Sequence, residues 1–398
     1  MRFLGNKTSL IHDIDAFITD SISKQTGLVF FDAFCGTGSV ANHFKQKFNV
    51  IINDHLKWAT TYSMGRIAAG ECLFEQLGFS PFEYLNSNTN IIRGFIHNTY
   101  SPAFTNRMYF TTENAGRIDY FRQTIEQWHL ENRINNSEYS FLLASLIESV
   151  SKVANIAGVY GAFLKEWDRR ALKPIQFIPA ESDYGSYRDL TVYNDKIENI
   201  ISEVDCDILY IDPPYSQNQY GTQYHLLETL ILNDHPSVSK VTGSRPVTPM
   251  RSDWSKEYQA HILLDYVLAG TKAKYVVMSY NNKGIMSKEF ISASMKRYGK
   301  HVNVIRIGYK KYQNWKSEDS QKHFEYLFFM EKKQTVVYQS PLNYIGNKSR
   351  VIDDIKRELP PEIDTFIDAF GGGFNVGINI NCNHIVYNEI NHFVCDVI

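Results

Sequence analysis

Short apolar runs separated by longer mixed segments are the main pattern along this chain. These runs have the length and composition of buried strands. They are Leu28–Phe31, Val50–Ile52, Ile208–Ile211, Tyr275–Met278 and Tyr326–Phe329. Helix-like periodic stretches lie between several of them, as at Val40–Phe48. Because alternating strands and helices are typical of α/β domains, we predict a Rossmann-like, doubly wound parallel sheet.

The segment between Asp54 and Asp195 is too long for an ordinary connection between strands. It contains helix-like stretches, notably Tyr139–Val153. We therefore predict a mostly helical insert over about residues 60–190. Such inserts lie over the carboxyl ends of the strands, where open α/β sheets bind ligands.

Motifs near the N-terminus recur in the same order near the C-terminus. The three pairs are Phe3–Lys7 with Tyr344–Lys348, Phe31–Phe34 with Ile367–Phe370, and Val50–Asp54 with His384–Glu389. This repetition predicts one complete module over residues 1–330, a linker at residues 331–340, and the start of a second, incomplete module at residues 341–398.

Composition narrows the class of protein without identifying it. The chain has 398 residues, 43% hydrophobic content and a net charge of −2, so any contact with nucleic acid requires a local basic patch. Five scattered cysteines without a CxxC pair argue against a disulfide framework and a metal cluster, and they favour a reducing cytoplasm. The sequence shows no membrane-length apolar stretch and no signal-peptide pattern, so we expect no membrane partner.

A glycine-rich loop, Asp32–Ser39, follows the first apolar run. Gly36 and Gly38 allow a tight turn and a close approach of the backbone to a ligand. Asp54 follows the next strand 18 residues after Gly36, which suits an acceptor for a ribose hydroxyl. This pattern alone does not distinguish a nicotinamide cofactor from S-adenosylmethionine, and an ordinary strand–helix turn is the alternative.

The sequence Asp212-Pro213-Pro214-Tyr215 follows a fully apolar strand and decides between these cofactors. An exocyclic amino nitrogen is a weak nucleophile, because its lone pair is delocalised into the base. The Asp212 carboxylate and the Pro213 carbonyl can accept its two N–H bonds and direct the lone pair toward a methyl group. Tyr215 can stack on a base that has left the duplex. The alternative is a simple turn after a strand.

In this order, Phe3–Lys7, Asp32–Ser39, Asn53-Asp54 and Asp212–Tyr215 resemble the D12 class of adenine-N6 DNA methyltransferases, which includes the Dam-type enzymes. Parts of the insert and the stretch after the last motif resemble the N-terminal half of the tandem FokI-type modification methyltransferases. Those parts are Tyr139–Ser151, Asn155–Leu172 and Tyr224–Glu228. The resemblance implies an S-adenosylmethionine-dependent methyltransferase sheet whose insert recognises the target.

The resemblance also implies roles for individual residues. Gly5 and Lys7 would contact the methionine part of the cofactor, and Asp54 would hold its ribose. The cofactor pocket would be lined by Asp32, Phe34, Gly36 and Gly38. Asp195 is a candidate contact for the cofactor's adenine, although an acid opening a helix at Lys196–Ile201 is an equal alternative.

Two basic clusters are candidates for DNA contact. One consists of Lys165, Arg169, Arg170 and Lys173, in which the two arginines could read guanine edges, although a charged helix face is the alternative. Lys310 and Lys311 belong to the basic stretch Lys296–Lys316, which suits phosphate contact or a solvated hairpin. His225 follows the catalytic motif, and we predict a packed or capping histidine there in preference to a general base.

These observations predict a restriction-modification adenine-N6 methyltransferase acting on double-stranded DNA in a bacterial cytoplasm. A cognate restriction endonuclease would recognise the same DNA site but would not need to bind this protein. Transfer to cytosine N4 or to a protein glutamine amide is one alternative. An inactive fragment that binds DNA or S-adenosylmethionine is another, and its unfinished module could pair with a complementary chain.

Overall fold

The computed structural model describes residues 5–23, 26–308, 324–333, 337–340, 342, 345–360 and 362–396. The chain divides into two compact units, Met1–Lys332 and Lys333–Ile398. Lys310 and Lys311 lie outside the described residues.

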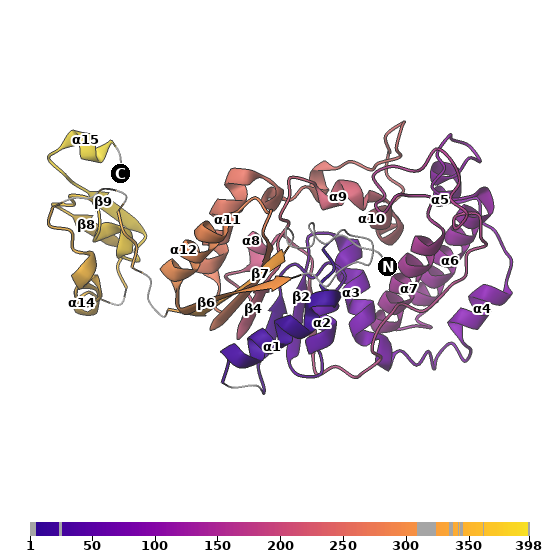
Figure 1. Cartoon of the computed structure of the whole chain (residues 1–398), viewed down its shortest axis with the longest axis horizontal. Helices are drawn as coiled ribbons and strands as arrows, with labels where there is room; N and C mark the ends of the chain where they lie inside the picture. Colours follow the sequence, from indigo (N-terminus) through magenta and orange to yellow (C-terminus); the bar gives the residue numbers. More distant parts are fainter. Residues whose placement is uncertain are drawn as a thin grey trace. The chain divides into compact units, whose positions relative to one another are not determined.

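The first unit is built around a seven-stranded sheet with the order β3-β2-β1-β4-β5-β7-β6 (Figure 1). Its strands are β1 Val29–Asp32, β2 Asn49–Asn53, β3 Leu190–Tyr193, β4 Ile208–Ile211, β5 Tyr275–Asn281, β6 Gly299–Gly308 and β7 Phe324–Lys332. The fold is therefore the predicted Rossmann-like α/β arrangement, and each of the five apolar runs lies in a strand except for Leu28, which precedes β1.

The sheet departs from the expected all-parallel form at one edge. Strands β3, β2, β1, β4 and β5 are parallel, whereas β7 runs antiparallel to both β5 and β6. Strand β6 begins directly after helix α12 (Lys288–Tyr298) and forms the outer edge, so that β7 is inserted between β5 and β6. The insertion places residues of β7 next to the end of β5.

Helices cover the sheet, and the insert between β2 and β3 combines helices with long irregular segments. The other helices among the described residues of this unit are α1 Ile11–Ser21, α2 Ser39–Phe44, α3 Lys57–Ala68, α4 Pro81–Ser87, α5 Phe95–Tyr100, α6 Thr112–Leu130, α7 Asn136–Val153, α8 Ile197–Ile200, α9 Tyr220–Gln223, α10 His225–Leu232 and α11 Glu257–Gly270. Short 3-10 turns occur at η1 Thr8–Leu10, η2 Ala69–Glu71, η3 Thr248–Met250 and η4 Asp253–Ser255. No helix in the described ranges has the length and apolarity to cross a bilayer.

Where the structure describes this unit, two large apolar cores stabilise it. One fills the space between the sheet and helices α1 and α2, with Phe30 and Ile208 fully buried in it. The other lies in the insert, where Tyr62 of α3 packs with Leu146 of α7 and Leu227 of α10. The insert is thus packed onto α3, which follows β2, and onto α10, which lies in the segment after β4.

The second unit contains a two-stranded parallel sheet of β8 Thr365–Asp368 and β9 His384–Tyr387. It also contains helices α14 Ile352–Glu358 and α15 His392–Cys395, with 3-10 turns η5 Ser349–Val351 and η6 Gly377–Asn379. Large apolar side chains remain in solvent here, including Ile345, Phe370 and Ile390, each at least 95% exposed.

Candidate cofactor and catalytic pocket

A cavity lies at the carboxyl ends of β1, β2 and β4. Strands β1 and β4 are neighbours, with Asp32 opposite Tyr210, so the residues that follow them meet at one edge of the sheet. The cavity is lined by Gly5, Lys7, Asp32, Phe34, Cys35, Gly36, Thr37, Ser39, Val40, Asp54, His55, Leu56, Trp58, Tyr210, Asp212, Pro213, Pro214, Tyr215 and Tyr220. The structure thus brings together every residue proposed for catalysis or cofactor binding except Gly38 and Asp195.

The glycine loop is shaped by left-handed backbone and by close packing. Gly36 has φ +48°, and a side chain there would meet nothing within 4 Å. Gly38 has φ +67°, and a Cβ on it would lie 2.1 Å from Ser63 Oγ. Gly38 is also the N-cap residue directly before helix α2. Gly36 therefore leaves room toward the cavity, whereas Gly38 is required for packing against α3.

Asp54 braces this loop. Its Oδ2 accepts a hydrogen bond from Gly36 N at 3.2 Å, and its Oδ1 accepts one from Leu56 N at 3.0 Å. The backbone is fixed further by Cys35 N, which donates to Asn53 O at 2.8 Å. The carboxylate proposed for the ribose thus lines the cavity and holds the loop that would surround the cofactor.

Asp195 lines a smaller neighbouring hollow with Phe34, His55 and Trp254. Its Oδ1 accepts hydrogen bonds from Lys196 N at 2.7 Å and Asn199 Nδ2 at 2.8 Å. These contacts belong to the start of α8, while the hollow adjoins the main cavity through Phe34 and His55. The geometry is compatible with both expectations for Asp195.

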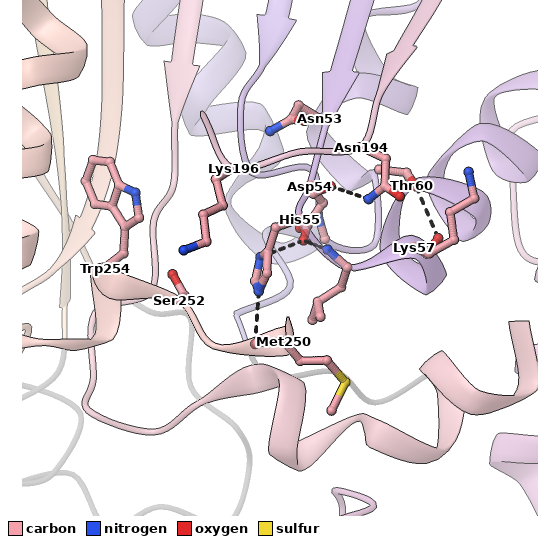
Figure 2. A network of polar contacts seen from close by, with 12 residues as sticks. Asn53, Asp54, His55, Lys57, Thr60, Asn194, Lys196, Met250, Ser252 and Trp254 are labelled. Atoms are coloured by element: carbon pink, nitrogen blue, oxygen red, sulfur yellow. Dashed lines mark hydrogen bonds and ion pairs between the residues drawn. The ribbon is translucent and has the colours of Figure 1, made fainter. Parts of the chain in front are cut away.

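The wall shared by these two hollows is built from residues far apart in sequence (Figure 2). His55 Nε2 lies 3.1 Å from Met250 O, which ties the end of β2 to the segment before α11. The Phe34 and Trp254 rings meet edge to face with centroids 5.1 Å apart. Sequence reasoning missed His55 and Trp254, because neither lies in a recognised motif.

The buried charges around Asp212 are the most distinctive feature of the cavity. Lys7 Nζ lies 2.8 Å from Asp212 Oδ1 and 2.7 Å from Glu325 Oε1. Burial would lower the pKa of Lys7, but the two carboxylates outweigh that effect and raise it well above its usual value. The resemblance places Lys7 at the cofactor, and the structure shows it paired with the Asp212 carboxyl as well.

Two buried carboxyls in this cavity have raised pKa values. Burial raises the pKa of Asp212, while Lys7 opposes the shift. Burial and the charge of Asp212 raise the pKa of Asp32 to about 8. Asp32 Oδ1 is buried and has no hydrogen-bond partner among the described residues, so it is a candidate acceptor for a cationic or N–H-bearing ligand.

Aromatic rings line the outer side of the cavity. Lys7 Nζ lies 5.2 Å from the centre of the Tyr215 ring, and Tyr215 meets Tyr280 edge to face. A Cβ on Gly5 would lie 3.3 Å from the hydroxyls of both Tyr215 and Tyr220. Gly5, with φ +81°, therefore allows the N-terminal segment to pass close to these rings.

Three of the basic residues proposed for DNA contact, Lys165, Arg169 and Arg170, lie outside this cavity. Lys165, Arg169 and Arg170 are exposed, but their segment consists of turns, so the expected alternative of a charged helix face is wrong. The segment is held by Asn155, whose Oδ1 accepts from Asp168 N at 2.9 Å. Arg170 Nη2 donates to Ala154 O at 3.0 Å. This part of the insert is therefore held by side-chain hydrogen bonds to the backbone and not by a helix.

His225 is packed, as predicted. It is fully buried at the start of α10, with the Tyr100 and Tyr109 rings next to it. Burial lowers its pKa to about 4. A histidine in this environment stays neutral at physiological pH and contributes to the core of the insert.

Comparison with known proteins fits this geometry. A family model described as "D12 class N6 adenine-specific DNA methyltransferase" matches residues 3–294 and again residues 344–397. This chain belongs to that family. The chain is 34% identical to type II methyltransferase M.FokI of Planomicrobium okeanokoites, with 100% of the chain aligned, and it spans 66% of the length of that relative.

Two further relatives support the assignment. Modification methylase LlaI of Lactococcus lactis subsp. lactis is 35% identical over 100% of this chain and 65% of its own length. Type II methyltransferase M.NlaIII of Neisseria lactamica is 32% identical over 83% of this chain and 99% of its own length. The D12-class resemblance seen in the sequence motifs is therefore confirmed.

Proposed function

We propose that this protein is a site-specific adenine-N6 DNA methyltransferase of a restriction-modification system. It transfers a methyl group from S-adenosylmethionine to an adenine flipped out of double-stranded DNA. The observation that carries this proposal is the shared cavity, in which Asp212 and its two prolines face the glycine loop and Asp54. Family membership and the names of the relatives support it.

The lining residues suit this cofactor. The buried, unpartnered Asp32 Oδ1 can accept an ammonium or N–H group, and Gly36 leaves the loop open toward the cavity. Asp54, which lines the cavity, would accept a hydrogen bond from a ribose hydroxyl of the cofactor. S-adenosylmethionine supplies an electrophilic methyl group attached to positively charged sulfur.

The chain's own residues prepare the amino group for attack. The Asp212 carboxylate and the Pro213 carbonyl accept its two N–H bonds, which localises the nitrogen lone pair. Pro213 and Pro214 fix the backbone so that these acceptors are in place before the reaction. S-adenosylmethionine held by Asp32, Gly36 and Asp54 would supply the methyl group and take up the electrons of the carbon–sulfur bond, and the proton lost from the nitrogen would pass to the Asp212 carboxylate.

The second unit repeats the hydrogen bonds of the cofactor loop. Gly372 N donates to Glu389 Oε2 at 2.9 Å, as Gly36 N does to Asp54 Oδ2 at 3.2 Å. Asn388 Nδ2 donates to Ala369 O at 2.8 Å, as Asn53 Nδ2 does to Ala33 O at 3.1 Å. These matches and the second family match support the proposal that residues 341–398 are the beginning of a second methyltransferase module.

The exposed apolar side chains of that unit suit a surface that pairs with further structure. Strand β8 has a described partner on one side only, whereas the equivalent β1 lies between β2 and β4. The remainder of a second module, or a complementary chain, would cover Phe370 and Ile390. Double-stranded DNA is the substrate in either arrangement, and a restriction endonuclease shares the site.

The proposal is tested by hydrolysing DNA incubated with the protein and S-adenosylmethionine to nucleosides, and then identifying the methylated base. N6-methyladenine is expected. N4-methylcytosine, or methylation of protein and not DNA, would replace this proposal with one of the other acceptors. Asp212→Ala should abolish transfer while cofactor binding survives, whereas Asp205→Asn, an exposed acid before the same strand, should leave both unchanged.

A chain ending at Lys332 separates an active first module from an inactive fragment. This shortened chain retains every residue that lines the cavity. We expect it to transfer methyl groups in steady state. Cofactor binding without turnover by both the full and the shortened chain would favour the binding-fragment alternative.

A further inference from the structure

Glu325 belongs to the catalytic charge cluster although it comes from a different part of the sheet. It is fully buried on β7, opposite Asn281 of β5 in the antiparallel register. Its carboxylate contacts Lys7, and Ser279 Oγ donates to its Oε1 at 2.6 Å. A continuous polar chain therefore runs from Ser279 through Glu325 and Lys7 to Asp212.

A buried carboxylate that lies behind the cavity and does not line it requires an explanation. Burying two acids and a lysine is costly, and such a cluster is weak evidence for stability by itself. Glu325 does not line the cavity, so it is not placed to touch a cofactor or a base. Its contact with Lys7 is as short as that between Lys7 and Asp212, so the ammonium group is shared between two acids.

We propose that Glu325 is a positioning residue, which acts through Lys7 to keep Asp212 available to the amino group of the substrate. Ser279 fixes Glu325 in turn. This inference rests on the proposed function. With Glu325 ionised, Lys7 is held between the two carboxylates. Without that charge, Lys7 pairs with Asp212 alone and competes with the substrate's N–H groups for the same carboxylate.

The charge of Glu325 also affects the titration of Asp212. Glu325 raises the pKa of Asp212 by repulsion, whereas Lys7 lowers it. Removing the negative charge of Glu325 therefore lowers the pKa of Asp212, so the carboxylate stays ionised to a lower pH. The other titratable side chains that interact with the Lys7–Asp212 pair are Asp32, Tyr210, Tyr215 and Tyr220.

The test is the pH profile of single-turnover methyl transfer by Glu325→Gln. We expect the acidic limb to move to lower pH by about one unit. The plateau rate should fall by about tenfold or more, because Lys7 is displaced toward Asp212. Ser279→Ala should move the acidic limb and lower the plateau rate in the same directions, but by smaller amounts. This second variant keeps the inference testable if Glu325→Gln fails to fold.

Glu331→Gln is the matched control. Glu331 lies on the same strand and pairs with Lys300 at the opposite end from the cavity. A profile for Glu325→Gln that coincides with that of Glu331→Gln would overturn the inference, as would slower transfer with no movement of the acidic limb. If the wild-type protein forms no methylated base, the proposed function fails first and the positioning role falls with it.

Discussion

Ionisation of Asp32 should make the affinity for the positively charged cofactor depend on pH. This carboxyl is 1% exposed, and its pKa is raised to about 8, so it carries a proton at neutral pH before a ligand binds. A cation entering the same cavity favours the ionised form. Binding of S-adenosylmethionine should therefore expel that proton.

The size of the effect follows from the pKa of the free protein. With a pKa of about 8, roughly one molecule in ten has ionised Asp32 at pH 7, and nearly all have it at pH 9. The affinity for S-adenosylmethionine should thus fall by about tenfold from pH 9 to pH 7. A tenfold change corresponds to about 1.4 kcal/mol of binding free energy. The fall continues with decreasing pH until the pKa of the bound state is reached.

Asp32→Asn removes the titrating group and keeps its shape. The dissociation constant of S-adenosylmethionine is measured by calorimetry between pH 6 and pH 9 for both proteins. The cofactor's own amino group titrates in both series, so the difference between the slopes reports Asp32. S-adenosylhomocysteine, which has neutral sulfur, should show a smaller difference. Equal slopes for wild type and Asp32→Asn would refute the reasoning.

Two further predictions concern the glycine loop. Gly38→Ala should destabilise the protein by about 1–3 kcal/mol more than Gly36→Ala in denaturant unfolding, because only a Cβ on Gly38 would lie 2.1 Å from Ser63 Oγ. Equal losses of stability in the two variants would show that the left-handed backbone alone accounts for the effect. Arg66 Nη1 donates to Thr37 O, between these glycines, at 2.6 Å, and Arg66 Nε donates to Glu181 O in the insert at 2.7 Å. Arg66→Met should weaken cofactor binding by about tenfold, whereas Arg188→Met, which loses a bond to Gln46 O, should not.

The sequence predicts the centre of the sheet well because buried parallel strands appear as unbroken apolar runs. The run Ile208–Ile211 is β4 itself, with all of its residues buried. Strands β3 and β6 were missed, since their residues are mostly exposed or half-buried and their sequences lack such a run. Edge strands depend on neighbours that a linear pattern does not display.

The candidate pocket was predictable for a related reason. Parallel strands end at one edge of the sheet, so motifs that follow β1, β2 and β4 must converge there. Glu325 could not be found this way, because β7 is antiparallel and brings its first residues to the same edge from the opposite direction. The contact between Glu325 and Lys7 joins the two ends of the first unit, and no local pattern predicts it.

A comparison of two buried lysines shows why location decides between a structural and a functional role. Lys45 is fully buried, yet its amino group reaches Asp183, which is 45% exposed, and Ile67 O, so it ties the insert to the sheet. Lys7 instead has two partners that are at most 12% exposed, at the strand ends that form the cavity. Apolar residues of similar volume would stabilise such a site at least as well. The charge at Lys7 is therefore better explained by the reaction than by the fold.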